Sequence, residues 1–135
     1  MHISWLGTTA IKIQAKPADI DLVLLIDPYK PKVGGFPRNL SANIALYTRG
    51  EQDSITVSGN PFVLSTPGES ETSGILITST QGAGEGEVVL RIDAEEMSLG
   101  HLGRANKLPT DEQLKVLSGV DVLFVPVGGG DSFDA

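Results

Sequence analysis

The stretch LVLLIDPY at residues 22–29 is the most informative segment for the fold. Its first five residues, 22–26, are all aliphatic, and a strand with apolar side chains at every position is typically buried on both faces. Residues 11–14 read IKIQ instead, and this alternation is typical of a strand with one face in water. Together the two patterns predict a sheet on which another layer packs.

Short strands dominate the first hundred residues, because β-branched and aliphatic residues form runs separated by Gly, Pro and Asp. The predicted strands are 2–6, 10–15, 22–26, 43–48, 54–57, 62–65, 74–79, 88–92 and 97–99. The glycine-rich segments 32–35 and 81–87 are predicted to be loops, the second of them a hairpin connection. No helix is predicted directly after either segment, so neither is expected to bind phosphate.

One helix is predicted clearly, at residues 111–117. Thr110 is suited to cap it, Gln113 completes a capping box, and Gly119 ends it. The apolar side of this helix is expected to comprise Leu114 and Leu117.

The run VDVLFVPV at residues 120–127 predicts a buried strand of the central kind. A helix followed by a buried strand indicates an α/β layer arrangement. The sequence stops soon afterwards, where Ser132 and Asp134 are suited to begin another helix. We therefore expect residues 1–135 to form a single domain.

Composition narrows the classes of partner and site. The chain has 135 residues, a formal net charge of -7 and no cysteine. The negative charge disfavours nucleic acid and anionic lipid, and the lack of cysteine excludes disulfides and sulfur-ligated zinc. No apolar run is long enough to cross a bilayer, and no signal-peptide pattern opens the sequence. We therefore expect a cytoplasmic protein with no membrane and no nucleic-acid partner.

Several segments, in order, resemble the metallo-β-lactamase superfamily, in particular the predicted Zn-dependent hydrolases related to ascorbate-6-phosphate lactonase. The segments are ISWLG at 3–7, LIDPY at 25–29, PGESE at 67–71 with SGI at 73–75, HLG at 101–103 and VDVLFVPVGG at 120–129. The resemblance implies an α/β fold, an αββα sandwich with a dinuclear metal site at one edge. The present chain resembles the N-terminal half of that sandwich, so the resemblance implies that residues 1–135 lack its C-terminal repeat.

The resemblance also implies a set of metal ligands, beginning with a His-x-His-x-Asp-His loop. Residues 49–54, RGEQDS, take the place of that loop. Arg49, Glu51 and Ser54 stand where the family has its three histidines, and Asp53 matches the loop aspartate. Most of the first ligand group is therefore predicted to be replaced.

Later ligands of the family are a histidine, a bridging aspartate and a final histidine. His101 matches the first of these, Arg104 falls where the aspartate is expected, and the final histidine has no counterpart in the sequence. Arginine is always cationic and only donates hydrogen bonds, so Arg49 and Arg104 would repel a metal ion. We therefore expect no catalytic residues and no dizinc centre, with Asp53 and His101 as remnants.

Alternatives stay open for several residues. His101 is either an ordinary histidine at a strand end or a surviving ligand, and Asp53 either pairs with Arg49 or Arg104 or caps the turn after Gly50. A weak Mg²⁺ or Mn²⁺ site would use Asp27, Glu51, Asp53 and His101. A Ser-His-Asp arrangement of Ser54, His101 and Asp53 has little support, because no nucleophile-elbow pattern surrounds any serine.

For two residues near the N-terminus, only a position in the structure is predicted. His2 is expected to face solvent at the start of an edge-like strand. Trp5 is expected to be a core or layer-contact anchor, because a large aromatic side chain buries much apolar area.

Three functions follow from these observations. The first is a non-catalytic protein with a binding or assembly role. The second is a half-fold that is completed by homo-oligomerisation or by a partner chain. The third is a metal-dependent hydrolase of a small phosphorylated or lactone substrate, with an altered ligand set.

Overall fold

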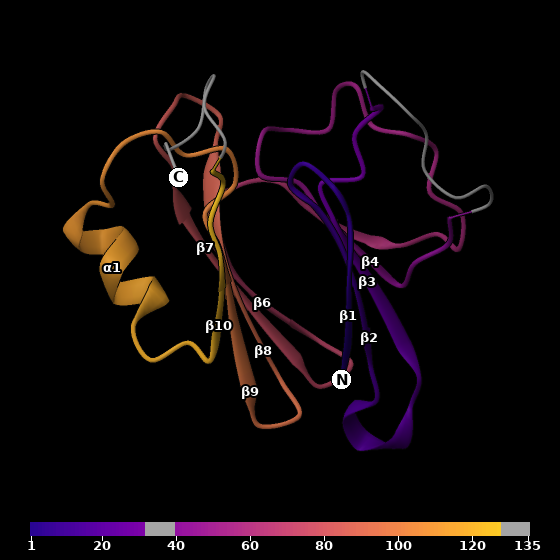
Figure 1. Ribbon diagram of the computed structural model, residues 1–135. Helices are drawn as coiled ribbons and strands as arrows, with labels where there is room; N and C mark the ends of the chain where they lie inside the picture. The colour runs from indigo at the N-terminus through magenta and orange to yellow at the C-terminus, as the bar shows by residue number, and fades with distance from the viewer. Residues whose placement is uncertain (32–39, 128–135) are drawn as a thin grey trace.

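The computed structural model describes residues 1–31 and 40–127. Within these residues the chain forms two five-stranded β-sheets that face each other, with α1 (Asp111–Leu117) on the outer side of the second sheet (Figure 1). A short 3-10 helix, η1 (Pro17–Asp19), connects two strands of the first sheet. These layers confirm the predicted α/β class with two sheets face to face; of the outer helices implied by the resemblance, the described residues show one, on the second sheet.

The first sheet has its strands in sequence order. They are β1 (His2–Gly7), β2 (Ala10–Ala15), β3 (Leu22–Ile26), β4 (Ile44–Leu46) and β5 (Phe62–Leu64). β1, β2 and β3 pair antiparallel, whereas β3, β4 and β5 pair parallel. The parallel pairs bring the carboxyl ends of β3, β4 and β5 to one end of the sheet.

The second sheet runs in the order β10-β9-β8-β7-β6. Its strands are β6 (Gly68–Thr72), β7 (Ile75–Gln81), β8 (Val88–Ala94), β9 (Met97–His101) and β10 (Val122–Phe124). β6 to β9 pair antiparallel, and β10 pairs parallel with β9. The predicted hairpin at 81–87 is confirmed, because Gln81 and Val88 face each other across β7 and β8.

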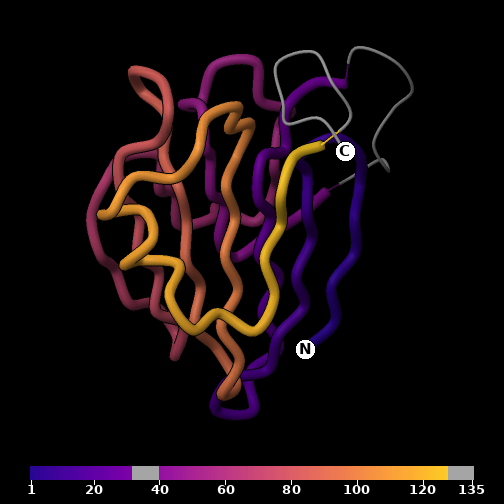
Figure 2. Tube along the Cα trace, turned by 60° about the vertical axis from the view of Figure 1, so that its left-hand side comes forward, coloured from indigo at the N-terminus to yellow at the C-terminus, as the bar shows by residue number. Residues whose placement is uncertain are grey.

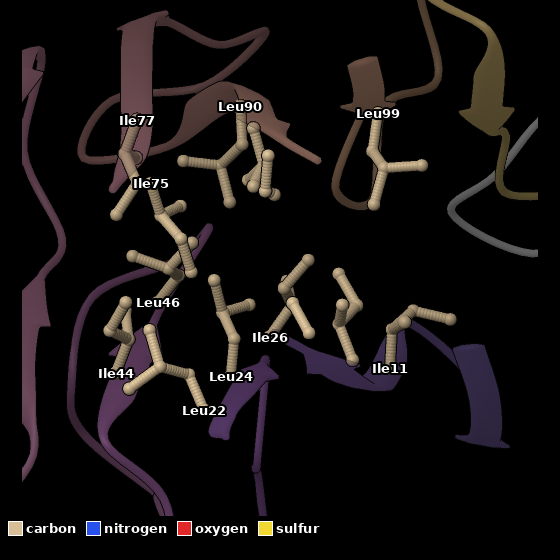
Figure 3. Close-up of a cluster of buried hydrophobic side chains, with 14 of the residues drawn as sticks. Ile11, Leu22, Leu24, Ile26, Ile44, Leu46, Ile75, Ile77, Leu90 and Leu99 are labelled. Atoms are coloured by element: carbon tan, nitrogen blue, oxygen red, sulfur yellow. The ribbon is translucent and has the colours of Figure 1, made fainter. Parts of the chain in front are cut away.

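The main hydrophobic core lies between the two sheets. Figure 3 shows aliphatic side chains of both sheets pointing toward one another. Leu24 and Ile26 enter this core from β3, whereas Leu25 packs on the opposite face with Leu40 and Ala42. The prediction that 22–26 is covered on both faces is therefore confirmed. Among the described residues, the outer cover of this sheet consists of irregular chain rather than a helix.

One strand prediction was wrong, and one strand was not predicted. Residues 54–57 form no strand; only isolated bridges join Tyr29 to Ser54 and Ser41 to Ser58. Ile55 and Val57 instead pack beside Leu25 as part of the irregular cover, which explains their apolar character. β6 was missed because its sequence, GESET, is polar, and an edge strand needs only backbone pairing with its neighbour.

Helix α1 begins and ends as predicted. Thr110 and Gln113 form both hydrogen bonds of the capping box, and Gly119 follows the helix with a φ of +73°. The predicted apolar side was partly wrong, because Leu114 is 52% exposed, whereas Gln113 and Leu117 are buried. The Gln113 amide donates to the Gln81 carbonyl oxygen at 2.8 Å, so a polar side chain anchors the helix to β7.

The strand predicted from 120–127 is shorter than expected, Val122–Phe124, and its place in the sheet differs from the prediction. β10 is the end strand of its sheet in the described part of the chain, not a central strand. Val122 and Phe124 face the core, whereas Leu123 and Val125 are more than 40% exposed. An apolar run alone does not distinguish the two positions, because an edge strand beside a second sheet also has apolar residues. The predictions for 32–35 and for Ser132 and Asp134 fall outside the described residues.

Candidate functional site

A cluster of polar side chains lies where the ends of several strands meet at one end of the sandwich. Asp27 follows β3, Thr48 and Arg49 follow β4, and His101 ends β9. Thr9 lies in the turn between β1 and β2. These five residues with Tyr29 are called the Asp27 cluster below. The Thr48 carbonyl oxygen also accepts the Val88 amide at 2.9 Å, which links the two sheets here.

Asp27 is the most buried charged residue of the cluster, with 1% of its surface exposed. One carboxylate oxygen accepts the Thr48 backbone N–H at 2.7 Å, and the other accepts the Thr48 hydroxyl at 2.6 Å. Its backbone has a φ of +53°, a left-handed conformation that few non-glycine residues adopt. A buried carboxylate needs such partners, because burial without hydrogen bonds is strongly unfavourable.

Arg49 supplies a positive charge beside this carboxylate. Its Nη1 atom lies 3.8 Å from Oδ2 of Asp27 and donates a hydrogen bond of 3.3 Å to the Thr9 hydroxyl. The guanidinium carbon lies 4.4 Å from the centre of the Tyr29 ring, a cation–π contact. The Arg49 side chain is 20% exposed, so it is held mostly inside the protein.

Tyr29 holds the loop after β4 in place. Its hydroxyl oxygen accepts the Arg49 backbone N–H at 2.8 Å, and the same hydroxyl donates to the Gly50 carbonyl at 2.7 Å. Burial, and next the negative charge of Asp27, raise the pKa of Tyr29 above its ordinary value. Tyr29 therefore stays a neutral phenol that both donates and accepts.

His101 uses both ring nitrogens inside the cluster. Nδ1 accepts the Gly103 backbone N–H at 2.9 Å, so the proton of the neutral ring is on Nε2, which donates to the Thr9 carbonyl at 2.9 Å. The residue is 2% exposed, and its ring lies 5.8 Å from that of Phe124. His101 does lie at a strand end, as one reading predicted, but its buried position beside Thr9 was not anticipated.

We expect protein stability to fall with pH below the ordinary pKa of histidine. Burial lowers the pKa of His101; the charge of Asp27 opposes this shift and that of Arg49 adds to it. Below about pH 6.5 the unfolded chain therefore binds a proton that the folded chain does not, so the free energy of unfolding decreases. Urea unfolding at about pH 7.5 and pH 5.5 measures the difference. His2→Gln, at an exposed histidine, should keep the same dependence, and a stability that rises toward pH 5.5 would contradict the assignment.

The remaining residues of the predicted ligand loop lie outside the Asp27 cluster. Glu51 and Asp53 are exposed, and Glu51 accepts a hydrogen bond of 3.4 Å from Ser65. Ser54 shares a hydrogen bond of 2.8 Å with the Tyr47 hydroxyl. Across residues 1–31 and 40–127, no group of three or more His, Asp or Glu side chains converges as a metal site would require.

The positions of these side chains decide between several arrangements that the sequence left open. The carboxylate that Arg49 approaches is Asp27, not Asp53, whose φ of +64° places it in a left-handed turn. Ser54 and His101 have different hydrogen-bond partners, so the structure does not assemble the Ser-His-Asp arrangement. Arg104 is exposed. The oxygen-rich set of Asp27, Glu51, Asp53 and His101 is likewise not brought together.

The cluster does not fit a dizinc centre. Two zinc ions need several imidazole and carboxylate ligands with free lone pairs. The cluster offers one imidazole, whose Nδ1 lone pair is already accepting a hydrogen bond and whose Nε2 carries a proton. Its one carboxylate already has the Arg49 guanidinium beside it. A bound cation would have to displace this arginine against charge repulsion.

A shallow cavity of about 270 Å³ opens beside the cluster, between the β1–β2 hairpin and β10. Thr9 and His101 contribute to its wall with Trp5 and Phe124. Figure 2 shows yellow β10 on the side of the molecule where indigo β1 and β2 lie. Trp5 is 72% exposed, so its prediction as a core anchor was wrong; its indole N–H donates to the Thr8 carbonyl at 2.9 Å. His2 is exposed as predicted.

Sequence analysis missed the pairing of Asp27 with Thr48 and Arg49. The available signal was an aspartate directly after a fully apolar strand and before Pro28, where a charged side chain is unusual. That signal predicts a buried carboxylate. It does not say which residues surround it.

No helix in the described part of the chain is long and apolar enough to span a bilayer.

Comparisons with known proteins identify the family. A model described as "Beta-lactamase superfamily domain" matches residues 2–135. A crystal structure from Thermotoga maritima, titled as a predicted Zn-dependent hydrolase of the metallo-beta-lactamase superfamily, is 25% identical with a TM-score of 0.81. The match covers 98% of the present chain and 64% of that chain, so about a third of that structure has no counterpart here. A search of curated proteins finds no match. This chain therefore belongs to the beta-lactamase superfamily and has a metallo-β-lactamase-like fold.

Proposed function

We propose that this chain is a metallo-β-lactamase-fold protein that has lost the dizinc site and acts in binding or assembly rather than catalysis. The observation that carries this proposal is the state of His101. Both of its ring nitrogens already make hydrogen bonds inside the protein, to Gly103 and Thr9. A histidine that serves as a zinc ligand needs one free lone pair.

The positions around the cluster support the same proposal. Arg49 brings a permanent positive charge to the loop where the resemblance implies the first metal ligand. Glu51 and Asp53, the acidic residues of that loop, are exposed and do not join His101. Replacement of neutral or anionic ligands by a cation removes the basis for activating a metal-bound water.

We expect the purified protein to contain well under one zinc ion per chain. Elemental analysis after expression in zinc-supplemented medium, followed by gel filtration, measures the ratio. A stoichiometry near two zinc ions, removed by a chelator together with a hydrolytic activity, would contradict the proposal.

The alternative function would then be a metal-dependent hydrolase of a small phosphorylated or lactone substrate. In that case the double variant Glu51→Gln, Asp53→Asn should lower both zinc content and turnover. This variant changes exposed side chains only, so a loss of activity would not be explained by unfolding. Unchanged activity in the double variant would exclude these two residues from the site.

An assembly role is supported by the position of β10, which is the end strand of its sheet within residues 1–31 and 40–127. Leu123, Val125 and Val127 are 43%, 44% and 58% exposed on this strand or just after it. An exposed apolar edge strand favours pairing with another chain, and a homo-oligomer or a partner chain would complete the sheet there. We place this assembly in the cytoplasm, in line with the lack of cysteine.

We expect the protein to be a dimer or larger assembly in solution, and the change Leu123→Lys to shift it toward monomer. A charge at the edge of a sheet opposes strand pairing. Light scattering coupled to size exclusion measures the mass. Leu108→Lys is the matched control, because Leu108 is 87% exposed outside the strands. A wild-type protein that is monodisperse and monomeric at micromolar concentration would count against self-association.

A further inference from the structure

We infer that Arg49 is an internal cation that assembles this end of the sandwich in place of a metal ion. The inference rests on the proposed loss of the dizinc site and adds which residue replaces the metal charge. It concerns the folded structure of the cluster, so its test is independent of any activity.

The need for a cation comes from Asp27. Its side chain is fully buried, and its two oxygens are fixed by the Thr48 amide and hydroxyl. Two hydrogen bonds do not neutralise a buried carboxylate, which is stable only beside an opposite charge. Among the described residues, Arg49 is the cation within 4 Å of this carboxylate, and its Nη1 lies 3.8 Å away. His101 is neutral and so adds no positive charge.

Arg49 also connects segments that lie far apart in the sequence. Its guanidinium donates to the Thr9 hydroxyl in the β1–β2 turn and stacks over Tyr29 after β3. The carbonyl of the same Thr9 accepts from His101 at the end of β9. The Arg49 side chain thus joins loops of the first sheet, and the Thr9 carbonyl connects them to His101 of the second sheet. Bound metal ions commonly combine these two roles, a strong local charge and the orientation of several segments.

The geometry favours arginine over lysine. The planar guanidinium lies 4.4 Å from the centre of the Tyr29 ring while one N–H reaches Thr9. A lysine ammonium is a point charge on a flexible stem and does not stack in this way. We therefore expect Arg49→Lys to retain the charge but only part of the stability.

A double-mutant cycle tests the inference. The proteins are wild type, Arg49→Met, Asp27→Asn and the double variant, with Arg49→Lys as a graded substitution. Urea unfolding is followed by circular dichroism with EDTA and with added zinc. We expect Arg49→Met to lower the folding equilibrium constant about 30- to 100-fold, since it leaves a buried charge unpaired, with a discount for the partial exposure of Arg49. In the Asp27→Asn background, Arg49→Met should lower the folding equilibrium constant by a factor that is at least about ten times smaller.

Arg104→Met is the matched control, because it removes the same charge from an exposed position and should leave unfolding unchanged. Wild-type unfolding should not respond to EDTA. If Arg49→Met is too unstable to purify, recovery of folded protein in the double variant supports the inference, and failure to recover it counts against it.

Two results would overturn the inference, and they differ from the result that overturns the proposed function. In the first, Arg49→Met has the same folding equilibrium constant as wild type. In the second, Arg49→Met lowers this constant by the same factor in the wild-type and in the Asp27→Asn background. A wild-type protein that EDTA destabilises and zinc restores would show that a metal supplies the charge, and the proposal of a lost dizinc site would then fail.

Discussion

Replacing Asp27 by alanine should lower the free energy of unfolding by about 3 to 5 kcal/mol. The change leaves the buried Thr48 N–H and hydroxyl without their acceptor and leaves the largely buried Arg49 charge unpaired. Thr48 also accepts the Val88 amide from the other sheet, so the loss should loosen the contact between the sheets. Urea unfolding followed by circular dichroism measures the effect.

Asp21→Ala is the control for this prediction, because Asp21 is exposed and its replacement changes the net charge by the same amount. Its effect should lie within about 0.5 kcal/mol of zero. The loss of unfolding free energy in Asp27→Asn should lie between those of Asp27→Ala and Asp21→Ala, since the amide keeps one acceptor for Thr48. An Asp27→Ala protein as stable as wild type would show that the carboxylate is not needed for folding.

Leu90→Ala is expected to have a similarly large effect, about 3 to 5 kcal/mol. Leu90 is 0% exposed in the middle of β8, and it points into the core between the two sheets (Figure 3). Alanine would leave a cavity among side chains contributed by both sheets, which cannot all move to fill it.

Thermal and urea unfolding of this variant should be compared with those of Leu108→Ala. Leu108 is 87% exposed, so the same chemical change there removes almost no buried surface. Both proteins should keep the same far-ultraviolet circular dichroism at low temperature. A loss below about 1 kcal/mol for Leu90→Ala would indicate that the two sheets do not share one packed core.

The two predictions concern different parts of one scaffold. The aliphatic core holds the two sheets together, whereas the Asp27 cluster is a group of polar side chains at one end of them. A fold by itself does not specify an activity, because activity depends on the groups placed at the site. In this chain the strand ends present an arginine–aspartate pair and a histidine with both nitrogens in use.

Local patterns in the sequence were sufficient for much of the fold. The strands at 10–15 and 22–26 and the helix at 111–117 have the predicted bounds. Each depends on interactions within a few residues: alternation, a continuous apolar run, or a capping box. The polar edge strand β6 lacked such a pattern, and residues 54–57 had a strand-like pattern but pack as irregular chain.

What the sequence alone determined is therefore the set of elements whose stability is local, together with the resemblance that identifies the superfamily. Tertiary structure alone decided that Arg49 meets Asp27 rather than Asp53, that Trp5 is exposed, and that β10 is the end strand of its sheet within the described residues. The physical reason is that the patterns that define a strand or a capped helix depend on interactions between residues close together in the chain. Charge pairing and burial depend on which strand ends the sheets bring together, through contacts between residues distant in the chain.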